Sequence, residues 1–466
     1  MVSSLRDPWR LKFHLMPPGG WLNDPNGLCQ FQGIYHIFFQ YHPESAAAGG
    51  GGPKVWGHYA GPSLTDLQFQ GIPFPQSELD RDGSYSGSAL IAEGAIQLFY
   101  TGNIRHAGDY DYIHDGRESN TIRIVSEDGK HYGEKQLLLT TSDYPRICTR
   151  HVRDPKVWKQ GTDYWMVLGA RQQNEQGSAL LYRSADARRW QFYKILTTPE
   201  PFGYMWECPD YFEDGGQAFL SLCPQGLPSE TLRFQNIYQA GYFRVTGALE
   251  EEQRLEDFHE WDMGFDFYAP QTFQDERGRR LLVAWAGLPD APYSNPTEAL
   301  GWQHALTLPR QLSRRGGILL QTPADEFSGL RFGETPLRDG DTFIVEDGSA
   351  DVELAFAEQS PWQIALGDGL LLSWREGIVQ LELSGSWGCG RTVRRLPLDS
   401  CRNLRLLIDT SMAEIFLNDG ESVLTARFYP DYQSGGGRRL PLALRCPGAV
   451  GTGWQLNPLP VNTCFH

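Results

Sequence analysis

The sequence predicts an all-β protein, a five-bladed β-propeller followed by a C-terminal β-sandwich. A short apolar strand, a glycine-bearing turn and a strand ending in aromatic residues recur five times at similar intervals, with turn glycines Gly33, Gly94, Gly161, Gly215 and Gly278. A unit of this length cannot bury both faces of its own small sheet, so neighbouring units must stack around an axis. Strictly alternating apolar and polar residues follow the repeats, which is typical of the half-buried strands of a sandwich.

Carboxylates stand just before a proline at three of the five repeat starts, at Asp24, Asp154 and Glu207. Proline donates no hydrogen bond to a β-ladder and biases the preceding residue to extended geometry, which suits the entrance of a strand. Because the innermost strands of a propeller point along one axis, residues at their entrances converge although they are far apart in sequence. One such carboxylate is most simply a turn former, but three in phase with one repeat predict an active site.

These patterns predict that the chain is divided into three segments. We expect the propeller in residues 1–322, a short linker helix in residues 323–333 and the sandwich in residues 334–466. The stretch 322–330 begins with a candidate helix cap and has two acids in its first turn, which is typical of a helix start. In the last segment, Asn418-Asp419-Gly420 is a tight-turn sequence between alternating runs, which favours antiparallel strand pairing.

The composition limits the classes of partner. Of 466 residues, 57 are acidic and 41 basic, for a formal net charge of −16, which disfavours nucleic acid and anionic membrane surfaces as partners. Aromatic residues make up 12% of the chain, with 14 Trp; their planar apolar faces suit stacking on sugar rings, although Trp is equally good core material. We therefore expect a small sugar as the ligand, with no nucleic acid and no membrane partner.

Signals for targeting, metals and cofactors are absent from the sequence pattern. Residues 1–20 carry several charges and lack the apolar stretch of a signal peptide, and no segment approaches the about 18 apolar residues of a membrane span. The eight cysteines are scattered without a CxxC pair, so reduced thiols in the cytoplasm are the simplest interpretation. The 11 histidines show no metal-binding spacing. We expect a cytoplasmic protein without metal or cofactor.

The three carboxylates suit the hydrolysis of a glycosidic bond, in which one group protonates the leaving oxygen and another attacks the anomeric carbon or activates water. Glu207 follows Tyr-Met-Trp, and such apolar company favours the protonated form that a general acid needs. Asp24 stands between asparagines, whose amides can keep it ionised as a nucleophile. Asp154 follows Arg153, whose guanidinium can hold nearby carboxylates ionised, so Asp154 suits binding of sugar hydroxyls in the transition state.

Motifs in a common family order extend over almost the whole chain. They are WLNDPNG (21–27), FQYHP (39–43), WGH (56–58), SGSA (86–89), YTGN (100–103), HVRDPKVW (151–158), YMWECPD (204–210), NIYQAGYF (236–243), GFDFYAPQTF (264–273), LTLPR (306–310) and DTSMAEIFLNDGE (409–421). On these motifs the chain resembles glycoside hydrolase family 32, the β-fructofuranosidases, within its bacterial sucrose-6-phosphate hydrolase or invertase branch. The resemblance implies a five-bladed propeller with a C-terminal sandwich and a retaining mechanism through a covalent fructosyl intermediate.

The resemblance also implies roles for individual residues. Asp24 matches the nucleophile, Glu207 the acid/base, and Asp154 the residue that binds fructosyl hydroxyls and stabilises the transition state. Other residues match positions that line the fructose subsite: Asn23, Gln40, Ser86, Arg153, Tyr268 and Trp285. For Gln40 and Ser86 a place at a strand edge is the structural alternative, and for Tyr268 and Trp285 packing within a blade.

The chain departs from the family pattern at two places. Members of this branch usually carry a further Trp in the loop before Trp-Gly-His, where this chain has the glycine-rich stretch Ala46–Gly52, and Tyr85 stands where Phe is common. That stretch lacks the Lys-Ser/Thr ending of a phosphate-binding P-loop, so we expect a mobile loop at the pocket rim. Trp56 is either a substrate-binding replacement for the missing ring or a core residue.

These observations predict a hydrolase of the fructosyl bond of sucrose or sucrose 6-phosphate. A hydrolase of short fructo-oligosaccharides is the alternative within the same class, and a propeller that only binds sugar is the alternative of another class. Recognition of a 6-phosphate requires cationic groups at the pocket rim, and the sequence does not rank the candidates His42, Lys54, Arg105 and Arg171. The oligomeric state stays open, with the sandwich as a candidate homodimer surface.

Overall fold

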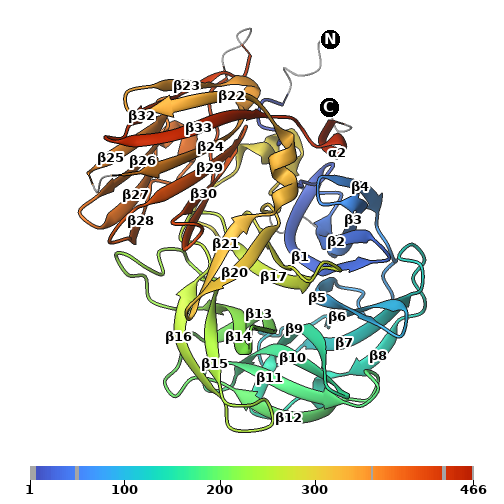
Figure 1. The fold of residues 1–466 in the computed structure, drawn as a ribbon. Helices are drawn as coiled ribbons and strands as arrows, with labels where there is room; N and C mark the ends of the chain where they lie inside the picture. The colour runs from blue at the N-terminus through green and yellow to red at the C-terminus, as the bar shows by residue number, and fades with distance from the viewer. Residues whose placement is uncertain (1–6, 48–51, 358–359, 433–436, 464–466) are drawn as a thin grey trace.

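The computed structural model describes residues 7–47, 52–357, 360–432 and 437–463, and Figure 1 shows two regions built almost entirely of strands. Strands from Gly20 to Pro323 form five sheets of four or five strands, and later strands form two sheets of six strands each. The innermost strands of the five sheets contact one another in a closed ring, in which β1 meets β5, then β9, β13 and β17, and β17 meets β1 again. The predicted propeller and sandwich are both confirmed.

The strands of the first three propeller sheets have the following bounds. The first sheet contains β1 (Gly20–Phe31), β2 (Ile34–His42), β3 (Val55–Ser63), β4 (Asp66–Gly71) and β19 (Trp302–Gln303). The second contains β5 (Ser84–Ala92), β6 (Ala95–Arg105), β7 (Arg117–Ser126) and β8 (Gln136–Leu139). The third contains β9 (Cys148–Gln160), β10 (Asp163–Gln172), β11 (Gly177–Ser184) and β12 (Gln191–Leu196).

Two further sheets complete the propeller. The fourth contains β13 (Met205–Asp214), β14 (Gln217–Gln225), β15 (Gly241–Thr246) and β16 (Arg254–Glu260). The fifth contains β17 (Tyr268–Gln274), β18 (Arg280–Trp285), β20 (Arg310–Arg315) and β21 (Ile318–Pro323). Pairing is antiparallel within each sheet except between β19 and β1, where Gly20 lies opposite Trp302 in parallel. A late segment therefore joins the first sheet and links the two ends of the ring.

The sandwich consists of two six-stranded sheets that enclose a separate apolar core. One sheet contains β22 (Arg331–Arg338), β24 (Ser349–Phe356), β29 (Asn403–Asp409), β30 (Met412–Leu417), β31 (Ser422–Arg427) and β33 (Ala449–Leu456). The other contains β23 (Thr342–Val345), β25 (Trp362–Leu366), β26 (Leu370–Arg375), β27 (Ile378–Leu383), β28 (Val393–Pro397) and β32 (Leu440–Arg445). Alternation along these strands places residues such as Val352, Leu372 and Leu406 in the core between the sheets.

Helical segments are short. They are the 3-10 helices η1 (Thr141–Asp143), η2 (Pro296–Leu300), η3 (Asp325–Leu330) and η4 (Glu346–Gly348), and the α-helices α1 (Gly385–Gly388) and α2 (Pro460–Thr463). The change from propeller to sandwich falls at η3, between β21 and β22. None of the helices in the described ranges has the length and apolar character that a membrane span requires.

The described parts of the N-terminal and C-terminal segments meet at the junction of the two regions (Figure 1). The backbone N–H groups of Lys12, Phe13 and His14 donate hydrogen bonds of 2.7, 2.9 and 3.0 Å to the carboxylate of Asp409 in β29. The side chain of Asn462 in α2 donates to the carbonyl of His14 at 2.8 Å. The N-terminal segment is therefore fixed by the sandwich before it enters the first propeller strand.

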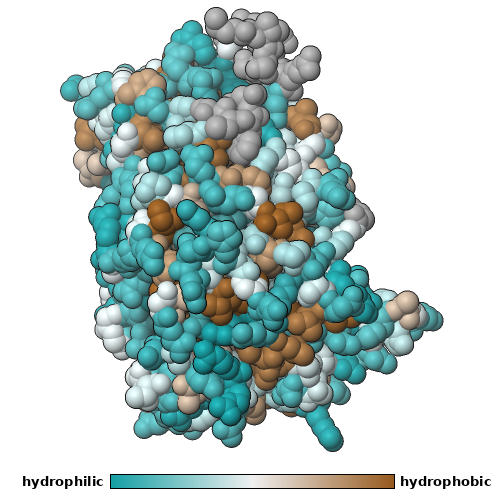
Figure 2. All heavy atoms as spheres, turned by 90° about the vertical axis from the view of Figure 1, so that its right-hand side faces the viewer, coloured by the Kyte–Doolittle hydropathy of each residue, from teal (hydrophilic) through white to brown (hydrophobic). Residues whose placement is uncertain are grey.

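The face turned toward the reader in Figure 2 is mostly hydrophilic, with hydrophobic residues in several separate patches. This agrees with the excess of acidic over basic residues, 57 against 41. The apolar residues are instead concentrated in the cores between neighbouring sheets, where Trp56, Trp165, Trp206, Trp261 and Trp302 are among the largest fully buried side chains. Much of the high aromatic content thus belongs to the packing between blades.

Candidate active site

One cavity of about 850 Å³ contains all three predicted acids, Asp24, Asp154 and Glu207. They stand on the innermost strands β1, β9 and β13, so the convergence expected from the repeat occurs. A smaller cavity of about 500 Å³ lies where β21 meets the sandwich, and none of the three acids lines it. The larger cavity is the candidate active site.

A β-bulge interrupts each innermost strand where it faces the cavity. The register shifts lie between Leu22 and Pro25, Ser84 and Gly87, Arg153 and Lys156, Glu207 and Asp210, and Tyr268 and Gln271. Within them Asp154, Cys208 and Ala269 adopt positive φ angles of 65°, 48° and 49°. A bulge redirects a side chain out of the regular alternation, and the proline that follows each of these bends has no N–H to leave unpaired. The bulges therefore explain why the carboxylate–proline pairs mark the site.

Asp24 accepts short hydrogen bonds from Asn23 and Ser86. The Asn23 side-chain N–H donates to Oδ1 at 3.0 Å, and the Ser86 hydroxyl donates to Oδ2 at 2.5 Å. Asn23 is itself oriented, because its amide oxygen accepts from Trp21 Nε1 at 2.8 Å and from Lys54 Nζ at 2.9 Å. The expectation that amide groups surround Asp24 holds for Asn23, and these contacts fix the carboxylate in one orientation.

Glu207 lies in polar surroundings, contrary to the expectation of apolar company. Nε and Nη2 of Arg153 donate to its Oε1 at 3.2 and 2.6 Å, and Gln225 Nε2 and the Tyr268 hydroxyl both donate to Oε2 at 2.7 Å. Its sequence neighbour Trp206 lies instead in a core cluster between the third and fourth sheets. Alternation along a strand sends neighbouring side chains to opposite sides, so the environment of Glu207 comes from other strands.

Asp154 is the carboxylate that burial affects most. Its Oδ2 accepts from the backbone N–H of Cys208 at 2.9 Å, while the closest Arg153 nitrogen, Nε, is 3.9 Å away. Burial raises the pKa of Asp154 to about 7, Arg153 opposes that rise and the nearby Glu207 adds to it. The Arg153 guanidinium is therefore hydrogen-bonded to Glu207 and lies farther from Asp154, its neighbour in sequence.

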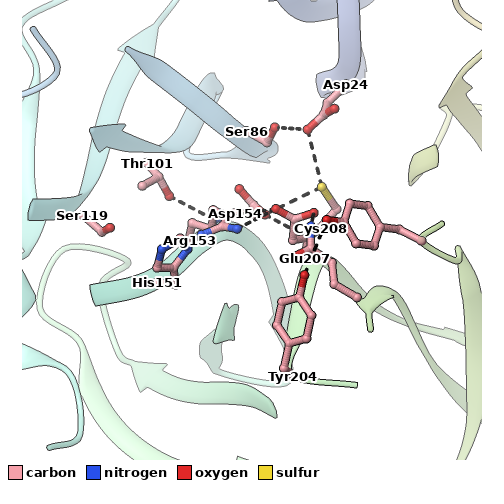
Figure 3. Close-up of polar contacts among 12 residues, drawn as sticks. Asp24, Ser86, Thr101, Ser119, His151, Arg153, Asp154, Tyr204, Glu207 and Cys208 are labelled. Carbon is pink, nitrogen blue, oxygen red and sulfur yellow. Dashed lines mark hydrogen bonds and ion pairs between the residues drawn. The ribbon is translucent and has the colours of Figure 1, made fainter. Parts of the chain in front are cut away.

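Cys208 lies between two of the acids, as Figure 3 shows. Its Sγ is 3.6 Å from Asp24 Oδ2 and 3.7 Å from Asp154 Oδ2. Burial, followed by the charges of the two aspartates, raises the pKa of this thiol well above its ordinary value. Sequence reasoning missed Cys208 because it sought charged and amide side chains; its place between Glu207 and a proline was the available signal.

The predicted substrate-binding residues divide into two groups. Those that line the cavity are Asn23, Gln40, Ser86, Arg153, Tyr268 and Trp285. Substrate binding by Trp56 is not what the structure shows, and the alternative of a core residue is correct. Its side chain is 0% exposed and packs with Phe38 and Phe74 in the core between the first two sheets. Its Nε1 donates to the carbonyl of Tyr85 at 3.0 Å. Trp56 therefore supports the wall of the cavity from behind and does not replace the missing loop ring.

The glycine-rich stretch Ala46–Gly52 borders the same cavity, since Ala47 and Gly52 are among its lining residues. The intervening residues 48–51, on which the expectation of a mobile rim loop rests, lie outside the described residues. The carbonyl of Ala46 accepts from Gln303 Nε2 at 2.7 Å. The beginning of the stretch is thus tied to β19, at the closure of the propeller ring.

Three cationic side chains besides Arg153 line the cavity, those of Lys54, Arg105 and Arg117. Lys54 Nζ donates to Asn23, and the Arg105 guanidinium lies over the Tyr112 ring at 5.4 Å. Arg117 is 8% exposed, and its Nε has no hydrogen-bond partner among the described residues. Burial lowers the pKa of Arg117 to about 10, and the like charges of Arg153 and Arg105 add to that effect.

The other two phosphate candidates differ from these. His42 lines the cavity, and both of its ring nitrogens are buried without a hydrogen-bond partner in the described part of the chain. Arg171 is paired with Glu175, and its guanidinium lies over the Tyr204 ring at 4.7 Å. In the ranges that the structure describes, no group of three or more His, Cys, Asp or Glu side chains is arranged to hold a metal ion. The absence of a cofactor stays a prediction.

Two family profiles match the chain. The profile described as "Glycosyl hydrolases family 32 N-terminal domain" matches residues 14–323, and "Glycosyl hydrolases family 32 C terminal" matches residues 388–440. The first match covers the propeller strands and all three acids. The second covers part of the sandwich.

Relatives and solved structures agree with the profiles. A sucrose-6-phosphate hydrolase of Bacillus subtilis (strain 168) is 38% identical over 443 residues, which cover 91% of this chain and 90% of the relative. A raffinose invertase of Escherichia coli is 36% identical over 482 residues, covering 96% and 95%. The structure of sucrose-6-phosphate hydrolase from Lactobacillus gasseri has a TM-score of 0.88 at 28% identity and covers 98% of this chain and 95% of that one. A Bombyx mori GH32 β-fructofuranosidase mutant in complex with sucrose has a TM-score of 0.84 at 28% identity, covering 97% and 95%.

Proposed function

The chain belongs to glycosyl hydrolase family 32, and we propose that it is a β-fructofuranosidase that cleaves the fructosyl bond of sucrose or sucrose 6-phosphate. The observation that carries the proposal is the convergence of Asp24, Asp154 and Glu207 in one cavity. The relatives support the substrate class, because they are named sucrose-6-phosphate hydrolase and raffinose invertase and a structural neighbour is a complex with sucrose.

In the proposed reaction Asp24 attacks the anomeric carbon of the fructosyl unit while Glu207 gives its proton to the departing glycosidic oxygen. The bond between fructose and glucose breaks, and a bond between Asp24 and fructose forms. Glu207 then takes a proton from water, whose oxygen displaces Asp24 and releases fructose. The donors from Asn23 and Ser86 support this role, because they hold Asp24 in one orientation.

Asp154 binds sugar hydroxyls in this proposal. Of its carboxylate oxygens, Oδ2 is occupied by the backbone N–H of Cys208. Hydroxyl groups of a bound fructosyl unit supply further hydrogen bonds, which stabilise the ionised form where positive charge develops on the sugar ring. Gln40, Tyr268 and Trp285 complete the lining of the same subsite.

We further propose that Arg105 and Arg117, which lie opposite each other in the β6–β7 pairing and both line the cavity, bind the phosphate of sucrose 6-phosphate. Arg117 supports this, because in the described part of the chain its buried guanidinium has an Nε without a hydrogen-bond partner and forms no ion pair with a carboxylate, which leaves it able to bind an anion. Arg105 lies at the exposed rim beside it. Among the four candidates from the sequence, Arg105 is therefore retained, Arg171 is dropped because Glu175 neutralises it, and Arg117 is added.

The test compares fructose release from sucrose and from sucrose 6-phosphate by three proteins, the wild type, Asp24→Asn and Arg117→Gln. We expect Asp24→Asn to abolish release from both, and Arg117→Gln to lower kcat/KM for the phosphorylated substrate about 10- to 100-fold more than for sucrose. Arg375→Gln, on the exposed side of β26, is the control for loss of one positive charge. No release by the wild type from either sugar contradicts the enzyme. An unchanged ratio of the two substrates in Arg117→Gln contradicts only the phosphate site.

The two alternatives predict different outcomes in the same assay. A hydrolase of short fructo-oligosaccharides releases fructose faster from 1-kestose than from either sucrose compound. A propeller that only binds sugar keeps its affinity in Asp24→Asn and has no turnover to lose. Cytoplasmic location and homodimerisation stay predictions, which fractionation of the native cells and the solution mass of the purified protein would check.

A further inference from the structure

His151, which the proposed chemistry does not use, is another lining residue of the cavity and lies beside Arg153, as Figure 3 shows. Arg153 Nη1 is 2.7 Å from His151 Nδ1, while Nε and Nη2 of the same guanidinium donate to Glu207 Oε1. Arg153 is therefore held on two edges, by Glu207 and by His151.

The hydrogen-bond partners of His151 fix its tautomer. Its Nε2 is 3.1 Å from the carbonyl oxygen of Tyr112, which can only accept, so Nε2 must carry the proton. Its Nδ1 faces Arg153 Nη1, which can only donate, so Nδ1 must be the unprotonated nitrogen. The two contacts agree on one neutral form of the ring, in which the acceptor points at Arg153.

The charges around His151 keep it in that form. Arg117 Nη1 lies 3.5 Å from Nδ1 and 3.4 Å from Nε2. These two distances are nearly equal and longer than the contacts with Arg153 and Tyr112, so Arg117 does not distinguish the tautomers, but it brings a second guanidinium to the ring. Burial lowers the pKa of His151 to about 2, and the positive charges of Arg153, Arg117 and Arg171 contribute to that fall. A second proton, on Nδ1, would bring two donors face to face and add a positive charge to those of the three arginines.

We propose that His151 is a positioning residue for the reaction, which orients the Arg153 guanidinium so that its Nε–Nη2 edge holds the acid/base Glu207. The inference rests on the proposed function. Without the Nδ1 acceptor, a buried N–H of Arg153 loses its partner, and an unpaired buried donor rotates or draws in water to regain one. Either change loosens the contact with Glu207 Oε1.

The expected consequence is a change in the pH dependence of turnover. The titratable and charged groups that face Glu207 are Arg153 and Tyr268, which contact it, and Asp154, Cys208 and Cys223. Of these, Arg153 is the cation that favours the ionised form of Glu207. When Arg153 is displaced, the protonated form persists to higher pH, and the alkaline limb of the kcat profile moves upward.

The experiment compares His151→Leu with His151→Asn, using sucrose and the pH profiles of kcat and KM. Leu removes the acceptor at about the same volume, whereas the Asn Oδ1 can occupy the place of Nδ1. We expect Leu to lower kcat about 10- to 100-fold with a smaller change in KM and to move the alkaline limb to higher pH. Asn should recover most of kcat and the wild-type limb. Equal profiles for Leu and the wild type overturn the proposal, and a wild type without activity contradicts the proposed function instead.

A second measurement on the wild type does not depend on how the variants fold. With 15N-labelled histidine, the ring signals of His151, assigned by their absence from His151→Asn, should report a neutral ring protonated at Nε2 from pH 8 to pH 5. Protonation of both nitrogens within that range, or a proton on Nδ1, contradicts the orientation of the acceptor toward Arg153. Either result would overturn the inference while leaving the assignment of Glu207 untouched.

Discussion

Two buried carboxylate clusters, one in the cavity and one at the junction of propeller and sandwich, use the same residue types for different ends. At the junction, Glu414 accepts from the backbone of Leu308 at 2.7 Å and from Arg310 Nε at 2.8 Å, and its Oε1 is 2.9 Å from His14 Nε2. In the cavity, Asp154 accepts from one backbone N–H and a distant thiol. Fixed donors saturate Glu414 at the junction, whereas Asp154 in the cavity keeps acceptor capacity for a ligand.

The pKa values of Glu414 and Asp154 are accordingly shifted in opposite directions. Although complete burial opposes it, Arg310 and His14 lower the pKa of Glu414, whereas burial prevails at Asp154 and raises its pKa to about 7. Burial also opposes the charge on His14, yet hydrogen bonds with Asp409 and Glu414 raise the pKa of that imidazole. Asp262, which shares Arg310, still has a raised pKa because burial outweighs its partners. The number of donors alone therefore does not decide the outcome, because Asp262 accepts from Gly264, Thr425 and Arg310 and burial still raises its pKa.

The same substitution in both clusters should separate catalysis from stability. Glu207→Gln removes the proton donor and should lower kcat for sucrose about 10²- to 10⁴-fold, with little change in the free energy of unfolding. Glu414→Gln leaves Arg310 and His14 short of a negative partner and should lower that free energy by about 3–5 kcal/mol, with kcat per folded molecule unchanged. Steady-state kinetics and urea unfolding of both proteins check the pair. A Glu414→Gln enzyme that is stable but inactive contradicts this division of roles.

Asp154→Asn should sharpen the comparison, because we expect it to raise the free energy of unfolding while it lowers kcat. The pKa of Asp154 rises from 3.8 to about 7, so the folded chain holds a proton that the unfolded chain releases. Its contribution to stability is therefore present below pH about 4 and is lost as the pH rises through about 7.

The neutral amide avoids that loss. At pH 8 we expect Asp154→Asn to raise the free energy of unfolding by about 1–3 kcal/mol, with no gain at pH 4 and a large fall in kcat. Thermal unfolding at the two pH values measures the effect. A gain of equal size at both pH values would show that packing, and not charge, is responsible.

The sequence was sufficient to predict the parts of the site that lie at repeat positions. Asp24, Asp154 and Glu207 were found because each stands just before a proline at a repeat start. The expected strand entrances are β-bulges inside β1, β9 and β13, and the propeller brings these bulges together. The alternating runs were likewise sufficient to predict the sandwich, because a half-buried strand shows its period directly. Local pattern and repeat symmetry specify these features.

Features that depend on contacts between blades could not be predicted from the sequence. The environment of Glu207 was expected to be apolar from its neighbours, but the bulge turns it toward Arg153 and Tyr268, which come from two other strands. Trp56 lies directly opposite Gln40 in the β2–β3 pairing, yet Gln40 lines the cavity while Trp56 lies in the core. Register and bulges decide such cases, and neither is visible in one strand alone.

The most direct test of the central claim is the anomeric form of the product when methanol competes with water during cleavage of sucrose. If Asp24 attacks and is later displaced, two inversions give net retention, and proton NMR should show methyl β-fructofuranoside, with none formed by Asp24→Asn. Methyl α-fructofuranoside as the first product would mean a single displacement by the acceptor. That result would contradict the role of Asp24 as the nucleophile and, with it, this account of the cavity.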